Sequence, residues 1–354
     1  MTKTDSGVPW AADRESGDFE LALKVRRALG APGNFHTVSV ALLASGETRF
    51  ASLGTGRTDA GGPATPDTSF ETGSVAKVFT GMLLAALDGA GTVSADQSVA
   101  SALPDARFAH AGAASATLAE LASHRSGLPR LHHRAGLLTN LRLALAVARG
   151  RDPYRAMGVA EFLRHAVAVA PTQARGTFAY SNLGMSLLGH TLGAHVEGGY
   201  PALLERELLA PLGMSATEVR TTYEPVKPIA SFAGPHAHTG KALTPWISAG
   251  YAPAGVGMRS TARDLSLLIR AMLEGNAPGA DAARPRYAAD GDRVGFGWIT
   301  SARDGRAFTW HNGATDGSRS FVGFDRERGR GVVLLSNTDQ DVDAVGARLV
   351  LDDD

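Results

Sequence analysis

The chain has 354 residues, and 44% of them are apolar, which is enough for a sizeable core in about one or two domains. Thirty-five basic side chains balance thirty-five acidic ones, so the basic excess of a nucleic-acid-binding protein or a polybasic membrane anchor is missing. The absence of cysteine excludes thiol catalysis, disulfides and cysteine-ligated metals. Five of the basic residues are lysines, so a lysine inside an apolar segment stands out.

The N-terminal twenty residues contain no apolar segment of the kind that forms a secretory signal. The longest apolar stretch, residues 75–87, is shorter than the roughly 18–20 residues that span a bilayer, and it contains Lys77. We therefore expect a cytoplasmic protein that binds neither a membrane nor nucleic acid.

Hydrophobic periodicity divides the chain into strand-rich ends and a helical middle. The N-terminal part predicts a helix at 18–29 and a hairpin of strands at 37–44 and 49–53. The middle predicts helices at 118–124, 141–149, 159–169, 182–196, 202–209 and 262–273. The C-terminal part predicts strands at 294–300, 307–310, 320–324 and 331–335, followed by a closing helix with Val342, Val345 and Leu349 on one face.

This order of elements predicts an α/β fold with two lobes. Residues 1–72 and 288–354 are expected to build one antiparallel sheet flanked by helices. Residues 73–287 are expected to form an inserted all-helical lobe. A cleft between two lobes is a usual place for an active site.

The first candidate for chemistry is the pair Ser74 and Lys77, at the start of an apolar helix. Residues three apart share a helix face. Unpaired N–H groups at the helix start can stabilise an oxyanion, and burial lowers the pKa of an amine toward the range of a base. A capping serine followed by a lysine that reaches out to solvent would give the same pattern.

Two further motifs carry polar side chains at the ends of elements. Tyr180-Ser181-Asn182 precedes a predicted helix, where a phenol can relay a proton and an amide can bind a carbonyl, although Ser181 or Asn182 could simply cap the helix. The segment from His311 through Asn312 and Gly313 to Ala314 ends a predicted strand. There an imidazole can face a cleft, and the N–H of Ala314 can serve as an oxyanion donor.

The remaining histidines give no convincing metal site. The pairs His132-His133 and His236-x-His238 lack a nearby acidic residue that would complete a ligand set.

Taken together, the three motifs resemble the serine β-lactamase and penicillin-binding-protein superfamily, in particular its branch of class C β-lactamases, DD-peptidases and esterases. The motifs occur in the order of that family. Their flanks match as well, at residues 70–74 (Phe-Glu-Thr-Gly-Ser), 126–129 (Ser-Gly-Leu-Pro), 211–214 (Pro-Leu-Gly-Met) and 253–255 (Pro-Ala-Gly). The resemblance covers roughly residues 35–350. It implies a β-lactamase-like α/β sandwich with a helical lobe, and neither a metal nor an organic cofactor.

The resemblance also implies a role for each site residue. Ser74 would be the acylated nucleophile, with Lys77 and Tyr180 as its proton-transfer partners. Asn182 would bind the amide on the acyl side of the substrate. His311, Asn312 and Gly313 would line the cleft, and the N–H groups of Ser74 and Ala314 would form the oxyanion hole.

One departure from the family pattern bears on the substrate. Penicillin-hydrolysing members usually have Lys-Thr-Gly or Lys-Ser-Gly where this chain has His311-Asn312-Gly313. An imidazole that is mostly neutral near pH 7 is a poor partner for a substrate carboxylate. Members of this branch with histidine here are often esterases, D-amino-acid amidases or acyltransferases.

We therefore predict a serine hydrolase that acts on a small ester or amide, of the esterase or D-amino-acid amidase and peptidase type. An acyltransferase of a biosynthetic pathway would use the same acyl-enzyme. A β-lactamase or DD-carboxypeptidase and a non-catalytic acyl-binding sensor are further alternatives. The sequence contains no Gly-x-Ser-x-Gly, which argues against an α/β-hydrolase.

Overall fold

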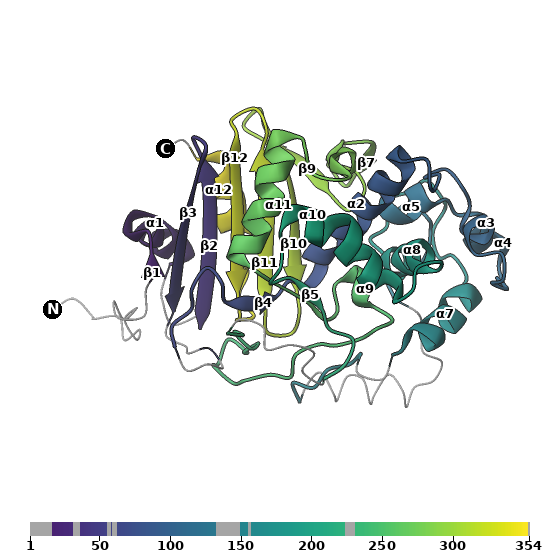
Figure 1. Cartoon of the computed structure of the whole chain (residues 1–354), viewed down its shortest axis with the longest axis horizontal. Coiled ribbons are helices and arrows are strands. Elements are labelled where there is room, and N and C mark those ends of the chain that lie inside the picture. The colour runs from purple at the N-terminus through teal and green to yellow at the C-terminus, as the bar shows by residue number, and fades with distance from the viewer. Residues whose placement is uncertain are drawn as a thin grey trace.

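The computed structural model describes residues 16–30, 36–54, 58, 62–131, 149–154, 157–223 and 231–352. Within these residues, one large antiparallel sheet has nine strands in the order β1-β3-β2-β12-β11-β10-β9-β8-β7 (Figure 1). These strands are β1 (Ser16–Gly17), β2 (Thr37–Ala44), β3 (Glu47–Gly54), β7 (Tyr287–Ala289), β8 (Asp292–Val294), β9 (Ile299–Arg303), β10 (Arg306–Ala314), β11 (Arg319–Asp325) and β12 (Arg330–Ser336). Strands from both ends of the chain thus share one sheet, which confirms the predicted α/β fold.

The two ends of the chain meet where β2 pairs with β12, with Val40 opposite Leu334. Successive side chains of these strands enter two different apolar clusters. Val40 and Leu334 pack into the cluster on one face, whereas Ala41 and Val333 pack into the cluster on the other. Because both faces are covered, each strand reads as a nearly continuous apolar run.

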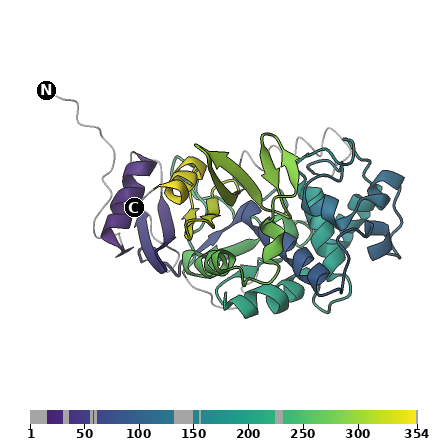
Figure 2. The ribbon, with the colours of Figure 1, turned by 90° about the horizontal axis from the view of Figure 1, so that it is seen from above.

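Helices cover both faces of the large sheet (Figures 1 and 2). α1 (Phe19–Leu29) and α12 (Asp343–Leu351) pack on one face, and α11 (Ala262–Glu274) packs on the other, against β2 and β12. Asp18 caps α1 by accepting a hydrogen bond of 2.8 Å from the N–H of Leu21. α11 therefore packs on the sheet, although residues 73–287 were expected to form the helical lobe.

The other helices gather beside the sheet, around α2 (Ala76–Gly89) (Figures 1 and 2). α2 contacts α5 (Leu118–Ala122), α8 (Asn182–Gly193) and α9 (Gly199–Leu204). α7 (Val159–Ala168) packs on α8, while α3 (Val99–Ala102) and α4 (Ala111–Ser115) form the outer end. Of the helix predicted at 141–149, residues 141–148 lie outside the described residues.

The strand predicted at 294–300 is wrong, because the chain forms β8, a tight loop and β9 instead. A glycine in the loop explains the break. Gly297 has a φ of 72°, and a Cβ on it would lie 2.3 Å from the carbonyl oxygen of Lys77. The loop between β8 and β9 therefore packs directly against the backbone of α2. A continuous strand could not make this close contact.

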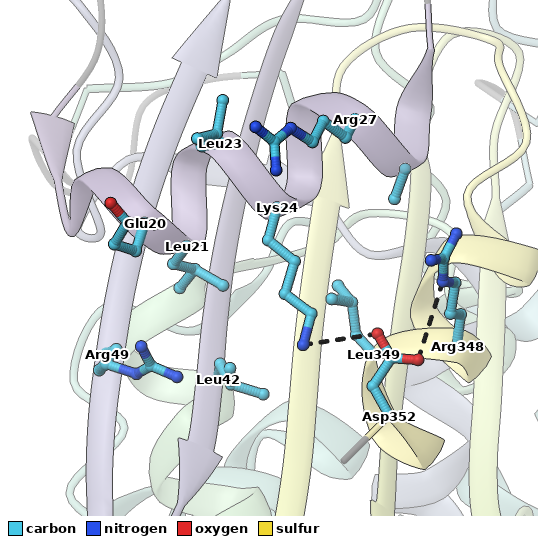
Figure 3. A pocket seen from close by; sticks show the side chains of 11 residues that line it. Glu20, Leu21, Leu23, Lys24, Arg27, Leu42, Arg49, Arg348, Leu349 and Asp352 are labelled. Carbon is cyan, nitrogen blue, oxygen red and sulfur yellow. Dashed lines mark ion pairs between the residues drawn. The ribbon is translucent and has the colours of Figure 1, made fainter. Parts of the chain in front are cut away.

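A pocket of about 490 Å³ lies between α1 and the C-terminal end of α12 (Figure 3). Asp352 lies in its wall and pairs with Lys24 at 3.4 Å and with Arg348 at 3.7 Å. Partly exposed pairs of this kind contribute little to stability. The described residues that line the pocket include no serine, tyrosine or histidine, so they offer no acyl nucleophile with a base.

Among the described residues, no helix combines the length and the apolar character needed to cross a membrane.

We expect Gly81→Ala to destabilise the protein even though alanine favours helices. Gly81 lies inside α2, and a Cβ there would lie 2.0 Å from the carbonyl oxygen of Phe296. Gly89 ends the same helix with open space around it, so Gly89→Ala is the matched control and is expected to be neutral or to stabilise by up to about 1 kcal/mol. Thermal unfolding would measure both variants, and equal melting temperatures would contradict the packing of the loop on α2.

Candidate active site

Ser74 lies at the junction between a small sheet and α2. β4 (Ser69–Glu71) pairs with β6 (Met258–Thr261), and a one-turn 3-10 helix (Gly73–Val75) leads from β4 into α2. The turn requires glycine at position 73, because φ is 49° there and a Cβ would lie 2.7 Å from the nitrogen of Ala314. Ser74 therefore stands at the N-terminal end of a buried helix, close to the end of β10.

Lys77 lies directly behind Ser74. Its Nζ is 2.8 Å from Ser74 Oγ, and it donates a hydrogen bond of 2.6 Å to the carbonyl oxygen of Ala254. The side chain is 0% exposed. Burial, with a smaller contribution from the charge of Arg130, holds the pKa of Lys77 well below its ordinary range. A lowered pKa favours the neutral amine, which is the form that can take a proton from a hydroxyl.

Tyr180 stands on the other side of Ser74. Ser181 caps α8, because its hydroxyl accepts a hydrogen bond of 2.8 Å from the N–H of Gly184. Nζ of Lys77 is 5.0 Å from the centroid of the Tyr180 ring, and the Ser74 hydroxyl is near enough to influence the pKa of the phenol. Burial raises the pKa of Tyr180 to about 12, so the phenol keeps its proton at neutral pH.

Asn182 is the first residue of α8 and lies beside Tyr180 in the chain. Its Oδ1 is buried and accepts no hydrogen bond from any described residue. Buried polar atoms are usually paired in folded proteins. The structure therefore leaves this buried amide oxygen without a donor from the described residues.

Gly313 and Ala314 bring the end of β10 against the turn that holds Ser74. A Cβ on Gly313 would lie 2.0 Å from the carbonyl oxygen of Thr72 and 3.0 Å from the nitrogen of Ser74. The nitrogen of Ala314 lies beside Gly73 in the same contact. The two expected oxyanion donors, the N–H groups of Ser74 and Ala314, are thus neighbours.

The side chains of His311 and Asn312 go to opposite faces of the sheet, since side chains alternate along a strand. His311 is 1% exposed, and its ring centroid is 6.4 Å from that of Tyr180. Asn312 donates a hydrogen bond to Asp343 on α12 instead. The structure therefore brings His311 to the group around Ser74 and does not bring the side chain of Asn312 there.

His311 is a neutral imidazole at neutral pH. Burial, reinforced by the nearby charge of Lys77, lowers its pKa to about 3. Its Nδ1 lies 2.5 Å from the carbonyl oxygen of Asn312, and a carbonyl oxygen can only accept. Nδ1 therefore carries the hydrogen, which leaves Nε2 as an acceptor.

His124, which none of the sequence motifs singled out, packs against Tyr180. The ring centroids of His124 and Tyr180 are 4.5 Å apart, and Nδ1 of His124 accepts a hydrogen bond of 3.2 Å from the N–H of Ser181. Burial holds the pKa of His124 well below its ordinary range. This neutral ring supports Tyr180 from behind. Its place two residues before the Ser-Gly-Leu-Pro segment was the one available signal.

The sequence motifs did not single out Arg130 either. It follows the same Ser-Gly-Leu-Pro segment, and its side chain is exposed. The guanidinium carbon Cζ lies 5.3 Å from the centroid of the Tyr180 ring. A permanent positive charge therefore stands at the edge of the site.

Glu71 is a buried carboxyl group three residues before Ser74. Its two oxygens accept hydrogen bonds from the N–H of Trp246 at 2.7 Å and from the hydroxyl of Thr315 at 3.0 Å. Burial raises the pKa of Glu71 to about 7. Glu71 thereby ties β4 to the residue that follows Ala314 and to the segment that leads to Ala254.

The histidine pairs gain no partners for a metal. His236 stacks on His36 with ring centroids 3.9 Å apart, and His132 and His133 lie outside the described residues. In the described part of the chain, no three acidic or histidine side chains come together closely enough to hold a metal ion.

A family model described as beta-lactamase matches residues 24–353, so the chain belongs to the beta-lactamase family, whose members are generally serine hydrolases. No curated protein sequence matches it.

Solved structures of class C enzymes share the fold. A class C beta-lactamase from Rhodobacter sphaeroides is 20% identical with a TM-score of 0.74, covering 90% of this chain and 95% of that one. Another class C beta-lactamase is 19% identical with a TM-score of 0.75, covering 91% and 92%. A beta-lactamase/D-alanine carboxypeptidase from Pseudomonas syringae is 18% identical with a TM-score of 0.73, covering 90% and 94%.

We expect Glu71 to make stability depend on pH. The unfolded carboxyl group loses its proton near pH 4.5, whereas the folded one keeps it up to about pH 7. The folded state then binds more protons in this window, so stability falls as pH rises through it, by at most on the order of 3 kcal/mol.

The variant Glu71→Gln keeps an acceptor for Trp246 but cannot ionise. Its melting temperature should therefore fall less than that of the parent between pH 5 and pH 8. Glu274→Gln, at an exposed site on α11, is the control that should behave like the parent. An unchanged pH dependence in Glu71→Gln would refute the assignment.

Proposed function

We propose that the protein is a serine hydrolase that cleaves small esters or amides through an acyl-enzyme on Ser74. The observation that carries the proposal is the 2.8 Å contact between Ser74 Oγ and the buried amine of Lys77. A nucleophile and a base within hydrogen-bond distance, with the base held by a third group, are the requirements of covalent acyl transfer. Here the third group is the carbonyl of Ala254.

The two pKa shifts support Lys77 as the base and Tyr180 as the acid. A neutral Lys77 takes the proton of Ser74 Oγ as that oxygen attacks the substrate carbonyl. Tyr180, whose pKa of about 12 keeps it protonated, donates a proton to the leaving group and recovers one from Lys77. Water then attacks the acyl-enzyme. Its proton passes through Tyr180 and Lys77 to Ser74 Oγ, which leaves as a hydroxyl.

The surrounding groups fit the substrate's remaining atoms. The N–H groups of Ser74 and Ala314 would hold the oxyanion that forms during each attack. The free Oδ1 of Asn182 would accept a hydrogen bond from an N–H on the acyl side. The oxyanion donors and the Asn182 amide both support acyl transfer to water.

The neutral His311 favours esters or amides that carry no carboxylate on the leaving-group side. β-Lactams carry such a carboxylate, and the usual lysine of the third motif would attract it. With a pKa near 3, His311 supplies no positive charge at neutral pH. The relatives named beta-lactamases share the fold, but this position separates the proposed activity from theirs.

We expect denatured-protein mass spectrometry to find an acyl or phosphonyl adduct on Ser74 after incubation with a p-nitrophenyl ester or a fluorophosphonate. Ser74→Ala should lose both the adduct and ester turnover, because no other hydroxyl contacts Lys77 Nζ among the described residues. Ser94→Ala, at an exposed serine, is the matched control and should be labelled normally. Full turnover by Ser74→Ala would overturn the proposal.

We expect p-nitrophenyl esters to be turned over much faster than nitrocefin. His311→Lys should raise the ratio of nitrocefin to ester turnover by about tenfold, since it restores a cation for the carboxylate. His311→Gln, which is neutral, is the control that should leave the ratio low. Steady-state kinetics would measure both, and nitrocefin turnover above ester turnover in the parent would contradict the role of His311.

A further inference from the structure

Arg130 lies next to Asn182, the residue that we propose binds the acyl side of the substrate. Its backbone carbonyl accepts a hydrogen bond of 3.1 Å from the N–H of Leu183, so it is fixed beside Asn182 at the start of α8. Its guanidinium is 5.3 Å from the centroid of the Tyr180 ring, and Lys77 Nζ is 5.0 Å from the same centroid. Arg130 therefore lies close to Asn182, the proposed acyl-side amide, and to Tyr180 and Lys77, the proposed proton relay.

The guanidinium of Arg130 has no carboxylate partner among the described residues. Arg125, in the same loop, offers a contrast. Its Nε donates a hydrogen bond of 2.8 Å to the carbonyl of Gly176, and its guanidinium lies 3.9 Å from the ring centroid of Tyr287. Arg125 is thus used to hold the loop, whereas the head group of Arg130 is left exposed at the site.

Arg130 is the charged group that acts on the titratable residues around Ser74. Its charge influences the pKa of Lys77, Tyr180 and His124, whereas Lys77 and His311 are themselves held neutral at neutral pH. The buried Glu71 and the Asp343 that binds Asn312 are used elsewhere. The site therefore favours an anion, and Arg130 is its permanent cation.

We propose that Arg130 selects substrates whose acyl group carries a carboxylate. The inference rests on the proposed acyl-enzyme function and names its substrate class. A planar guanidinium matches a carboxylate with two parallel hydrogen bonds, which gives Arg130 a geometric preference for this group. The carboxylate would lie on the acyl side because Arg130 adjoins Asn182, so it differs from the leaving-group carboxylate of a penicillin.

Three p-nitrophenyl esters of matched length test the charge preference. They are the mono-ester of adipic acid, which is anionic, the mixed methyl ester of adipic acid, which is neutral, and the ester of 6-aminohexanoic acid, which is cationic. The parent protein is expected to show a kcat/KM about tenfold higher for the anionic ester than for the neutral one. Added salt should shrink this ratio, since the head group is exposed.

The variants are judged on the ratio of rates, so a general loss of activity does not obscure the result. Arg130→Gln should bring the ratio of anionic to neutral ester close to one, and Arg130→Glu should reverse it in favour of the cationic ester. Arg107→Gln removes an exposed charge between α3 and α4, at the outer end, and should keep the parent's ratio. Circular dichroism would verify folding.

The remaining outcomes separate a failure of the carboxylate preference from a failure of the proposed function. If the neutral ester acylates Ser74 but the parent shows no preference for the anionic ester, the inference is overturned and the proposed function stands. An equal fall for all three esters in Arg130→Gln, with a shifted pH profile, would overturn it as well, because Arg130 would then act only on Tyr180 and Lys77. If no ester acylates Ser74, both proposals fail.

Discussion

The structure around the active site depends on the burial of the Lys77 amine. An ammonium without a paired carboxylate is costly to bury, so the amine is held as a weak acid–base group between Ser74 Oγ and the carbonyl of Ala254. That carbonyl is delivered by a turn ending at Gly255, where a Cβ would lie 2.0 Å from the carbonyl oxygen of Gly73. The backbone of Lys77 is in turn covered by the loop at Gly297. The contacts around Lys77 and its neighbours thus bring together three separate segments.

Local rules were sufficient for the parts of the site that depend on spacing. Ser74 and Lys77 share a helix face because they are three residues apart, and the apolar neighbours of Lys77 correctly indicated burial. The runs at 37–44 and 331–335 were assigned to strands because each is apolar enough to be covered on both faces. The resemblance to a known family then linked motifs that lie more than a hundred residues apart.

Long-range packing decided what the sequence could not indicate. The side chain of Asn312 goes to α12 because strand alternation places His311, and therefore not its neighbour, on the side of Ser74. The break between β8 and β9 depends on the approach of Gly297 to α2. His124, Arg130 and Glu71 flank or belong to the family segments, but their significance comes from partners distant in sequence, such as Tyr180 and Trp246.

The pairing of β2 with β12 has a consequence for how the chain becomes active. Almost three hundred residues separate Val40 from Leu334, so this contact forms late and closes a very large loop. A chain still emerging from the ribosome already holds Ser74 and Lys77 but not yet Ala314. The nucleophile and its base therefore exist before the second oxyanion donor has been synthesised. Completion of the sheet during biosynthesis thus also marks the moment at which the assembled site first exists.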